Sequence, residues 1–126
     1  MMTTSLDGLM IMVVEDDFLA ALELKRLVEE RAGTVAGPVG RLDQAQALAD
    51  TTRLDGAILD VKLNGSVSLP LVDDLIARGV PVILVTGYDA ARLPDRFAET
   101  PRLPKPFSEV DFDQIVGQVF AAGAAD

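Results

Sequence analysis

The sequence predicts an α/β domain built on a doubly wound, five-stranded parallel sheet with helices on both faces. Five short apolar runs lack the alternation of apolar and polar residues that marks a half-exposed strand. Such runs are typical of strands that are buried on both faces of a parallel sheet. The runs alternate along the chain with stretches of helical periodicity. This order requires right-handed crossover connections, which place helices on both sides of the sheet.

The predicted strands are followed by segments whose helical signals differ in strength. The strands cover residues 10–14, 34–37, 56–60, 80–85 and 102–104. After the first strand, apolar residues recur at helical spacing from Ala20 to Ala32, and Gly33 is expected to end this helix. A shorter, Ala-rich helix is predicted over residues 43–50.

The second half of the chain contains a well-marked helix and a poorly marked one. The former begins at Ser68, carries Pro70 in its first turn and ends at Gly79. The segment 89–99 contains Pro94, which removes a backbone donor and is poorly tolerated inside a helix. We therefore expect the fourth helix to be short or broken.

The last helix has the clearest pattern of all. Apolar residues at 112, 115, 116, 119 and 120 follow helical spacing without a gap. Ser108 with Asp111 three positions later resembles a capping box, which marks the start of this helix.

Composition excludes several classes of function. The chain of 126 residues has 11 Lys or Arg and 20 Asp or Glu, so its formal net charge is −9. It contains no Cys and no His, so disulfides, zinc–thiolate sites and Ser-His triads are excluded. We expect no nucleic-acid partner, because the acidic charge repels phosphate backbones. Any metal ion must be held by oxygen ligands, which suits Mg²⁺.

The chain shows no sign of a membrane or export segment. The apolar run 9–14 is followed directly by acidic residues and is too short for a signal-peptide core or a membrane span. We expect a cytoplasmic protein with no membrane partner. We further expect residues 1–126 to form a single domain with a core at about 9–120, without an output domain.

Polar residues gather where the predicted strands end. The first strand is followed by Glu15 and Asp16, the third ends in Asp60, the fourth is followed by Thr86, and the fifth by Lys105. The carboxyl ends of parallel strands meet at one edge, where ligands bind in open α/β sheets. Each residue taken alone also fits a helix cap, a turn or an exposed charge. Together they predict one site, in which a divalent cation and a lysine offset the repulsion between carboxylates.

Four segments resemble the receiver domain of two-component response regulators. They read VVEDD at 13–17, ILDVKL at 58–63, VTGY at 85–88 and LPKPF at 103–107. The resemblance extends from about residue 9 to residue 120. It implies a flavodoxin-like (βα)5 receiver fold, and a signalling domain rather than an enzyme.

The resemblance implies a phosphoacceptor and a metal site. Asp60 corresponds to the aspartate that accepts a phosphoryl group from a phosphohistidine. Glu15 and Asp16 correspond to the acidic pair that holds Mg²⁺, together with Asp60 and the backbone carbonyl of Lys62. Asp17 comes one residue too late for this pair, and we expect it to cap the first helix.

The resemblance also implies how the phosphoryl group is bound and where it comes from. Thr86 matches the switch hydroxyl and Lys105 the phosphate-binding lysine, and the Lys105–Pro106 peptide bond is expected to be cis. The donor would be a sensor histidine kinase or a histidine phosphotransfer protein. Output would pass to an unknown downstream protein by contact, or the domain would act as a phosphate relay or sink.

One stretch is similar to a narrower group. PVILVTGY at 81–88 resembles the Pro-Phe-x-Phe-Ala-Thr-Gly-(Gly/Tyr) segment of the FAT GUY single-domain receivers, whose fourth helix is commonly reduced. Where typical receivers have Tyr or Phe three residues before the lysine, this chain has Arg102. Tyr88 could replace that aromatic switch, and Lys62, Tyr88 and Arg102 are candidate modulators of phosphate lifetime.

The family's usual signalling surface covers the fourth helix, the fifth strand and the fifth helix. Its candidate contact residues in this chain are Leu93, Phe97, Arg102 and Phe107, although Phe107 also fits a core position.

Two other functional interpretations of the sequence stay open. The first is a pseudo-receiver, a binding module that signals without phosphate. The second is an enzyme on the same fold, although neither G-x-G-x-x-G nor a Walker A motif is present, and Lys62 stands where an acyl-phosphate phosphatase would have a second aspartate.

Overall fold

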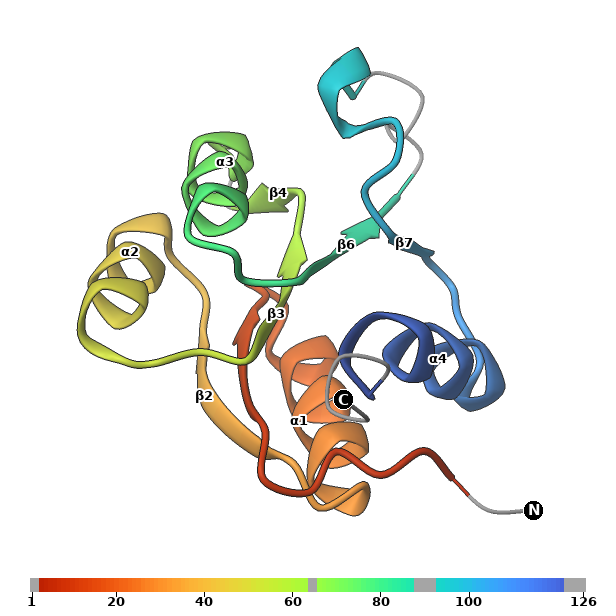
Figure 1. The fold of residues 1–126 in the computed structure, drawn as a ribbon. Helices are drawn as coiled ribbons and strands as arrows, with labels where there is room; N and C mark the ends of the chain where they lie inside the picture. The colour runs from red at the N-terminus through yellow and green to blue at the C-terminus, as the bar shows by residue number, and fades with distance from the viewer. Residues whose placement is uncertain (1–2, 64–65, 88–92, 122–126) are drawn as a thin grey trace.

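The computed structural model describes residues 3–63, 66–87 and 93–121. Its centre is a five-stranded parallel sheet with the strand order β2-β1-β3-β6-β7 (Figure 1). The strands are β1 Met10–Val14, β2 Thr34–Val39, β3 Gly56–Asp60, β6 Val82–Thr86 and β7 Arg102–Pro104. The predicted doubly wound, flavodoxin-like sheet is thereby confirmed.

Helices cover both faces of this sheet. They are α1 Phe18–Glu30, α2 Leu42–Thr51, α3 Leu69–Ala77 and α4 Glu109–Val116. Figure 1 shows α2 and α3 on one side of the sheet and α1 and α4 on the other. No helix within the described ranges is long and apolar enough to cross a membrane.

The three central strands, β1, β3 and β6, contribute side chains to two separate cores. In β1, Met12 and Val14 pack with α2 and α3, whereas Ile11 and Val13 pack with α1 and α4. All four side chains are fully buried. Successive side chains of a strand point to opposite faces, so a strand covered on both sides has to be apolar throughout. This explains the uninterrupted apolar runs in the sequence.

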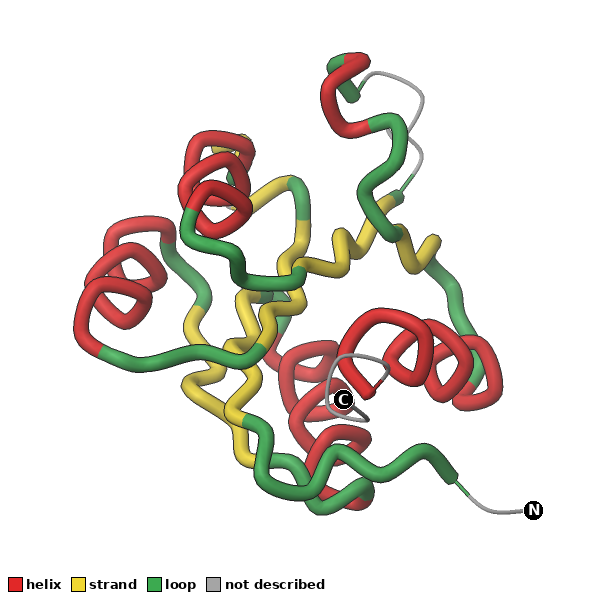
Figure 2. The backbone as a smooth tube through the Cα atoms, in the orientation of Figure 1, coloured by secondary structure: helices red, strands yellow, loops and turns green. Residues whose placement is uncertain are grey.

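The structure adds one small hairpin to the predicted order and resolves the form of the fourth helical segment. A two-stranded antiparallel hairpin, β4 Lys62–Leu63 with β5 Ser66–Val67, follows β3. In the described part of segment 89–99, the helical structure is a 3₁₀ turn at Asp95–Phe97, visible as a short coil in Figure 2. The expectation of a short or broken fourth helix agrees with this turn.

Most helix ends agree with the sequence signals, but α1 ends at Glu30, and Ala32 rather than Gly33 takes the left-handed conformation after it (φ 68°). Asp17 caps α1 by accepting the amides of Leu19 and Ala20 at 2.9 and 3.1 Å. Ser108 and Asp111 form the predicted capping box of α4. The α-helical part of the last helix ends at Val116, and the chain continues as a π-helical turn over Gly117–Ala121.

One candidate for the signalling surface is buried instead. The side chain of Phe97 is 1% exposed and belongs to the core under α2 and α3. The prediction that Phe97 lies on a contact surface is therefore wrong, because a large ring in a short turn is stabilised by packing inward. Phe107 is half-buried and its ring stacks on Phe112 with centroids 6.4 Å apart.

A buried arginine fastens the N-terminal segment to α1 and α4. The Arg31 side chain is 1% exposed, and its Nε donates to Asp113 Oδ1 at 2.9 Å. The same carboxylate oxygen accepts the Thr4 amide at 2.8 Å. Leu6, nearby in this segment, is fully buried, and its amide donates to the Arg31 carbonyl at 2.7 Å.

We expect Asp113→Ala to lower the free energy of unfolding by about 2 kcal/mol, because it leaves the buried Arg31 charge unpaired. The Thr4 amide, and then Arg31, lower the pKa of Asp113 below its ordinary 3.8. The stabilisation is therefore fully present above about pH 4 and is lost as the pH falls through the lowered value. Urea unfolding of both proteins at pH 7 and pH 3 measures this difference.

The matched control for this prediction is Glu29→Ala. Glu29 forms an exposed ion pair with Lys25 on α1, and such pairs contribute less than about 1 kcal/mol. Equal destabilisation by the two variants at pH 7 would contradict a special role for the Arg31–Asp113 pair.

Candidate functional site

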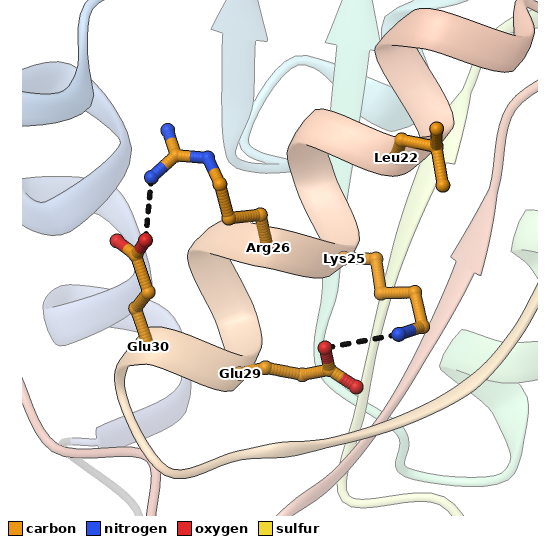
Figure 3. Close-up of a pocket in the computed structure, with 5 residues that line it drawn as sticks. All are labelled: Leu22, Lys25, Arg26, Glu29 and Glu30. Atoms are coloured by element: carbon orange, nitrogen blue, oxygen red, sulfur yellow. Dashed lines mark hydrogen bonds and ion pairs between the residues drawn. The ribbon is translucent and has the colours of Figure 1, made fainter.

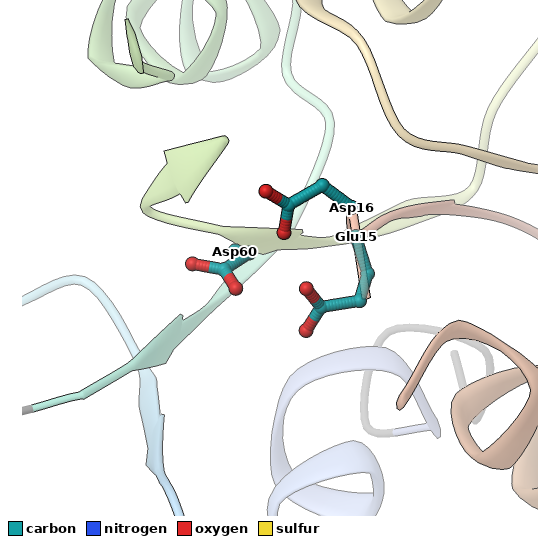
Figure 4. A group of neighbouring side chains, drawn as sticks. All are labelled: Glu15, Asp16 and Asp60. Carbon is teal, nitrogen blue, oxygen red and sulfur yellow. The ribbon is translucent and has the colours of Figure 1, made fainter. Parts of the chain in front are cut away.

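Three carboxylates converge at the carboxyl edge of the sheet. Glu15 and Asp16 directly follow β1, and Asp60 is the last residue of β3. One oxygen from each lies within 4.8 Å of the others, and Figure 4 shows the three groups facing a common space. Glu15 is buried, Asp60 is partly buried and Asp16 is exposed. Oxygen ligands at this spacing suit a hard divalent cation.

A lysine that directly follows β7 binds two of these carboxylates. Lys105 Nζ donates to Glu15 Oε1 at 2.8 Å and to Asp60 Oδ2 at 2.9 Å. The Lys105 amide donates to the Thr86 carbonyl at 2.8 Å, which holds this residue against the end of β6. The Lys105–Pro106 peptide bond is cis. With all groups ionised, three negative charges face one positive charge.

Backbone amides hold the second oxygen of each bridged carboxylate. Asp60 Oδ1 accepts the Lys62 amide at 2.9 Å, and Glu15 Oε2 accepts the Asp17 amide at 3.2 Å. Both side chains are therefore fixed in orientation before any ligand binds. Preorganisation of this kind reduces the reorganisation that a ligand would otherwise require.

Burial and charge act in opposite directions on the ionisation of this cluster. Burial raises the pKa of Glu15 from 4.5 to about 7, contact with Lys105 opposes this rise, and the neighbouring Asp60 adds to it. Burial alone would lower the pKa of Lys105, but its contacts with Glu15 and Asp60 outweigh burial and raise it. Lys105 therefore carries a stable positive charge at the sheet edge.

Thr86 places a hydroxyl at the end of β6, next to this cluster. The residue is 2% exposed, and its Oγ1 has no hydrogen-bond partner among the described residues. A buried hydroxyl without a partner costs about 1–3 kcal/mol. Such a group fits a site that binds a further acceptor, for example an anionic oxygen.

The remaining predicted site residues are Lys62, Arg102 and Tyr88. Lys62 is exposed and stands in the hairpin that follows Asp60. Arg102 donates from its guanidinium to the Phe97 carbonyl at 2.9 Å, so part of this side chain faces the Asp95–Phe97 turn. Tyr88 lies outside the described residues.

Two residues that support the site were not singled out from the sequence. A Cβ placed on Gly40, just after β2, would stand 3.3 Å from Asp16 Cα and 3.4 Å from the Glu15 carbonyl oxygen. Ser68 was assigned only as a helix start, yet its hydroxyl lies 2.9 Å from the carbonyl oxygen of Asp60. A glycine after a strand and a serine before a helix are common, so neither carried a distinctive signal.

A groove of about 280 Å³ begins at the cluster and runs between α1 and the chain that follows β7. Its lining combines the buried Leu24 and Leu27 with the exposed acids Glu23 and Glu109. The lining residues are Glu15, Asp17, Ala20, Glu23, Leu24, Leu27, Lys105, Phe107 and Glu109.

Comparison with known proteins assigns the chain to a family. No protein-family model matches it. It is 31% identical to SdrG from Sphingomonas melonis Fr1, with 93% of this chain and 97% of SdrG covered at a TM-score of 0.78. It is 27% identical to the receiver (REC) domain of the response regulator PhyR from Erythrobacter litoralis, with 89% of each chain covered at a TM-score of 0.80. The chain belongs to the response regulator receiver family.

A curated relative and a further structure extend this result. The receiver chain is 33% identical over 117 residues to the phyllosphere-induced regulator PhyR of Methylorubrum extorquens, covering 86% of this chain and 42% of that protein. It therefore spans about half the length, or less, of its curated relatives. At 22% identity and a TM-score of 0.75, its fold matches the receiver domain of the sensor histidine kinase PA1611 from Pseudomonas aeruginosa PAO1 over 90% of this chain and 98% of that one. That structure holds a magnesium ion in its active-site cleft.

We expect Mg²⁺ to stabilise this receiver, because a cation offsets the repulsion between the three carboxylates. At ten times the dissociation constant, the free energy of unfolding should rise by about 1.4 kcal/mol and the melting temperature by a few degrees. Chelation with EDTA should reverse the shift. Differential scanning calorimetry with and without Mg²⁺ measures it.

Two variants separate a specific site from general screening. Asp16→Asn should remove most of the Mg²⁺-dependent shift, whereas Asp7→Asn, an exposed acid in the N-terminal segment, should retain it. An equal shift in both variants would show that Mg²⁺ acts only on the overall negative charge.

Proposed function

We propose that this receiver accepts a phosphoryl group on Asp60 in a cytoplasmic phosphorelay. The donor is a phosphohistidine on a sensor histidine kinase or a histidine phosphotransfer protein. The modified domain then signals by contact with a downstream protein, or serves as a phosphate relay or sink. One observation carries this proposal: Lys105 Nζ bridges Glu15 and Asp60 beside a buried Thr86 hydroxyl that has no partner in the described chain.

The donor set suits magnesium as the cofactor of this reaction. Carboxylate oxygens of Glu15, Asp16 and Asp60, and the backbone carbonyl of Lys62, would hold the ion. Mg²⁺ prefers oxygen ligands and is usually bound by one or two carboxylates together with water and phosphate oxygens. When bound, it supplies positive charge to the oxygens of the transferring group.

The residues of the chain provide positioning and charge for the transfer. An oxygen of the Asp60 carboxylate forms a bond to phosphorus while the bond from phosphorus to the histidine nitrogen breaks, and that nitrogen keeps the electron pair. Lys105 then faces a group more negative than the carboxylate it held before. The Thr86 hydroxyl donates to an oxygen of the same group and gains a partner that it lacks among the described residues. Transfer of this kind depends almost entirely on such placement.

The likeness to SdrG and PhyR supports the narrower assignment to the FAT GUY receivers. The 3₁₀ turn at Asp95–Phe97, where a full helix is usual, is in keeping with it. In this assignment Lys62, Tyr88 and Arg102 modulate how long the phosphoryl group survives. Arg102 stands where the aromatic switch is usual and donates a hydrogen bond to the Phe97 carbonyl; either Arg102 or Tyr88 takes over the switch.

The first turns of α1 offer a docking face for the phosphoryl donor. Phe18, Leu19 and Leu22 are 73%, 75% and 44% exposed, and α1 begins two residues after Asp16. Further along α1, the surface is charged and internally paired, as Figure 3 shows for Lys25 with Glu29 and Arg26 with Glu30. The exposed apolar side chains are thus confined to the end of α1 that lies beside the site.

Acetyl phosphate labelling tests the central step. With Mg²⁺, the intact mass should rise by one phosphoryl group. The gain should be lost with EDTA and in Asp60→Asn, because both the acceptor oxygen and the charge balance are needed. Asp55→Asn is the control on an acid at the opposite end of β3, and it should still be labelled.

The absence of any gain at saturating Mg²⁺ would contradict this function. Such a result would favour the pseudo-receiver, a module that binds its partner without phosphate.

A second experiment tests the docking face. We expect Leu22→Asp to slow transfer from a histidine-phosphorylated phosphotransfer protein by at least tenfold, because an exposed charge would then have to be buried in the complex. Labelling by acetyl phosphate should be unchanged, since a small donor needs no docking face. Ile76→Asp, at a similarly exposed apolar residue on α3, is the matched control. Equal transfer to all three proteins would place the donor elsewhere.

A further inference from the structure

A fully buried serine contacts the backbone of the proposed phosphoacceptor. Ser68 is 0% exposed. Its Oγ lies 2.9 Å from the carbonyl oxygen of Asp60 and 3.1 Å from that of Val61. The Ser68 amide donates to the same Val61 carbonyl at 2.9 Å. Three hydrogen-bonding contacts therefore connect Ser68 to Asp60, the last residue of β3, and to Val61, which follows it.

The side chain makes these contacts instead of capping α3. Ser68 is the N-cap residue of α3, but its hydroxyl accepts no hydrogen bond from the first turn. Its carbonyl accepts the amides of Leu71 and Val72 at 3.0 and 3.1 Å. Ser68 thus belongs to the start of α3 through its carbonyl and to the end of β3 through its hydroxyl and amide.

These contacts close the loop that follows Asp60. The chain leaves the sheet after Asp60, forms the β4–β5 hairpin in which Lys62 pairs with Val67, and returns to Ser68. On the other side, the Val61 amide donates to Val85 on β6 at 3.2 Å. The backbone of residues 60–62 is thereby held by Ser68 at the base of its loop and by β6 at the sheet.

The same short backbone carries two functions of the proposed site. Asp60 supplies the acceptor carboxylate, and Lys62 supplies the amide that holds Asp60 Oδ1 at 2.9 Å and the carbonyl proposed for the metal ion. A serine hydroxyl has one proton to donate, and it lies within hydrogen-bond distance of two carbonyl oxygens in a part-buried position. Without it, these oxygens keep fewer contacts and the base of the loop is less constrained.

We propose that Ser68 is a positioning residue of this receiver: its hydroxyl fixes the backbone of residues 60–62 and so sets the Asp60 carboxylate and the Lys62 carbonyl relative to Glu15 and Asp16. The expected effect of Ser68 on Mg²⁺ binding and on phosphorylation rests on the proposed function. The constraint that Ser68 places on the backbone of residues 60–62 does not. Replacing a residue that orients the metal ligands without binding the metal typically changes metal affinity by 10- to 100-fold.

Two variants remove or weaken the hydrogen-bond donor of Ser68, and a third variant controls for stability. Ser68→Ala removes the hydroxyl, and Ser68→Cys keeps a similar volume with a much weaker donor. Val72→Ala, one turn into α3 at a fully buried side chain, weakens the same helix without touching the loop. Each protein is measured by amide hydrogen exchange, by calorimetric titration with Mg²⁺ and by the rate of acetyl phosphate labelling at saturating Mg²⁺.

We expect both Ser68 variants to accelerate exchange of the Val61 and Lys62 amides by at least tenfold relative to core amides of β1, and to weaken Mg²⁺ binding by about tenfold. Val72→Ala should lower the melting temperature but leave Mg²⁺ affinity and the relative exchange of these two amides unchanged. The Cys variant keeps the comparison valid if the Ala variant is poorly folded.

The outcomes for Ser68 and for the proposed function are separate. Folded Ser68 variants with wild-type exchange at Val61 and Lys62 would overturn the positioning role, whatever the wild-type chain does with phosphate. If exchange accelerates while Mg²⁺ affinity and labelling stay at wild-type values, Ser68 holds the loop without positioning the site, which also overturns the proposal. A wild-type chain that neither binds Mg²⁺ nor accepts phosphate would instead overturn the proposed function.

Discussion

The repulsion between carboxylates at one edge of the sheet is the constraint on which the rest of the site depends. Two unit charges 4 Å apart repel by about 4 kcal/mol at an effective dielectric constant near 20. Lys105 offsets part of this repulsion by donating to Glu15 and Asp60 together. Among the described groups of the site, one lysine does not balance three ionised carboxylates, so the site is suited to a cation. In the proposed transfer, the same lysine would face a phosphorylated Asp60, which is more negative than the carboxylate.

The parallel sheet is what brings these charges together. Glu15, Asp60, Thr86 and Lys105 come from the ends of β1, β3, β6 and β7, and these four strands are neighbours in the order of the sheet. Both faces are packed by buried apolar side chains, which fix the strand ends. Close backbone contacts then refine the positions, from Gly40 against Asp16 and from Ser68 against Asp60. The fold thus provides a rigid support for groups that repel one another.

Much of the fold could be predicted from the sequence, because strands buried on both faces leave uninterrupted apolar runs and helix caps leave local signals. The strand ends also brought Glu15, Asp16, Asp60, Thr86 and Lys105 into one predicted cluster, and these residues meet at the sheet edge in the structure. The role of Ser68 could not be predicted, because serine before a helix usually caps it and only the path of the hairpin turns its hydroxyl toward β3. The burial of Phe97 could not be predicted either, because it depends on how the Asp95–Phe97 turn packs on a core made by distant residues.

A crystal structure grown with Mn²⁺ and beryllofluoride, a stand-in for the phosphoryl group, would test the central claim most directly. We predict an anomalous peak within coordination distance of the Asp16 and Asp60 carboxylates and the Lys62 carbonyl. We also predict density for beryllofluoride on the Asp60 carboxylate, with Thr86 Oγ1 and Lys105 Nζ donating hydrogen bonds to its fluorine atoms. An ordered sheet edge with no anomalous peak and an unmodified Asp60 that still binds Lys105 would contradict the claim that this cluster is built to accept a phosphoryl group.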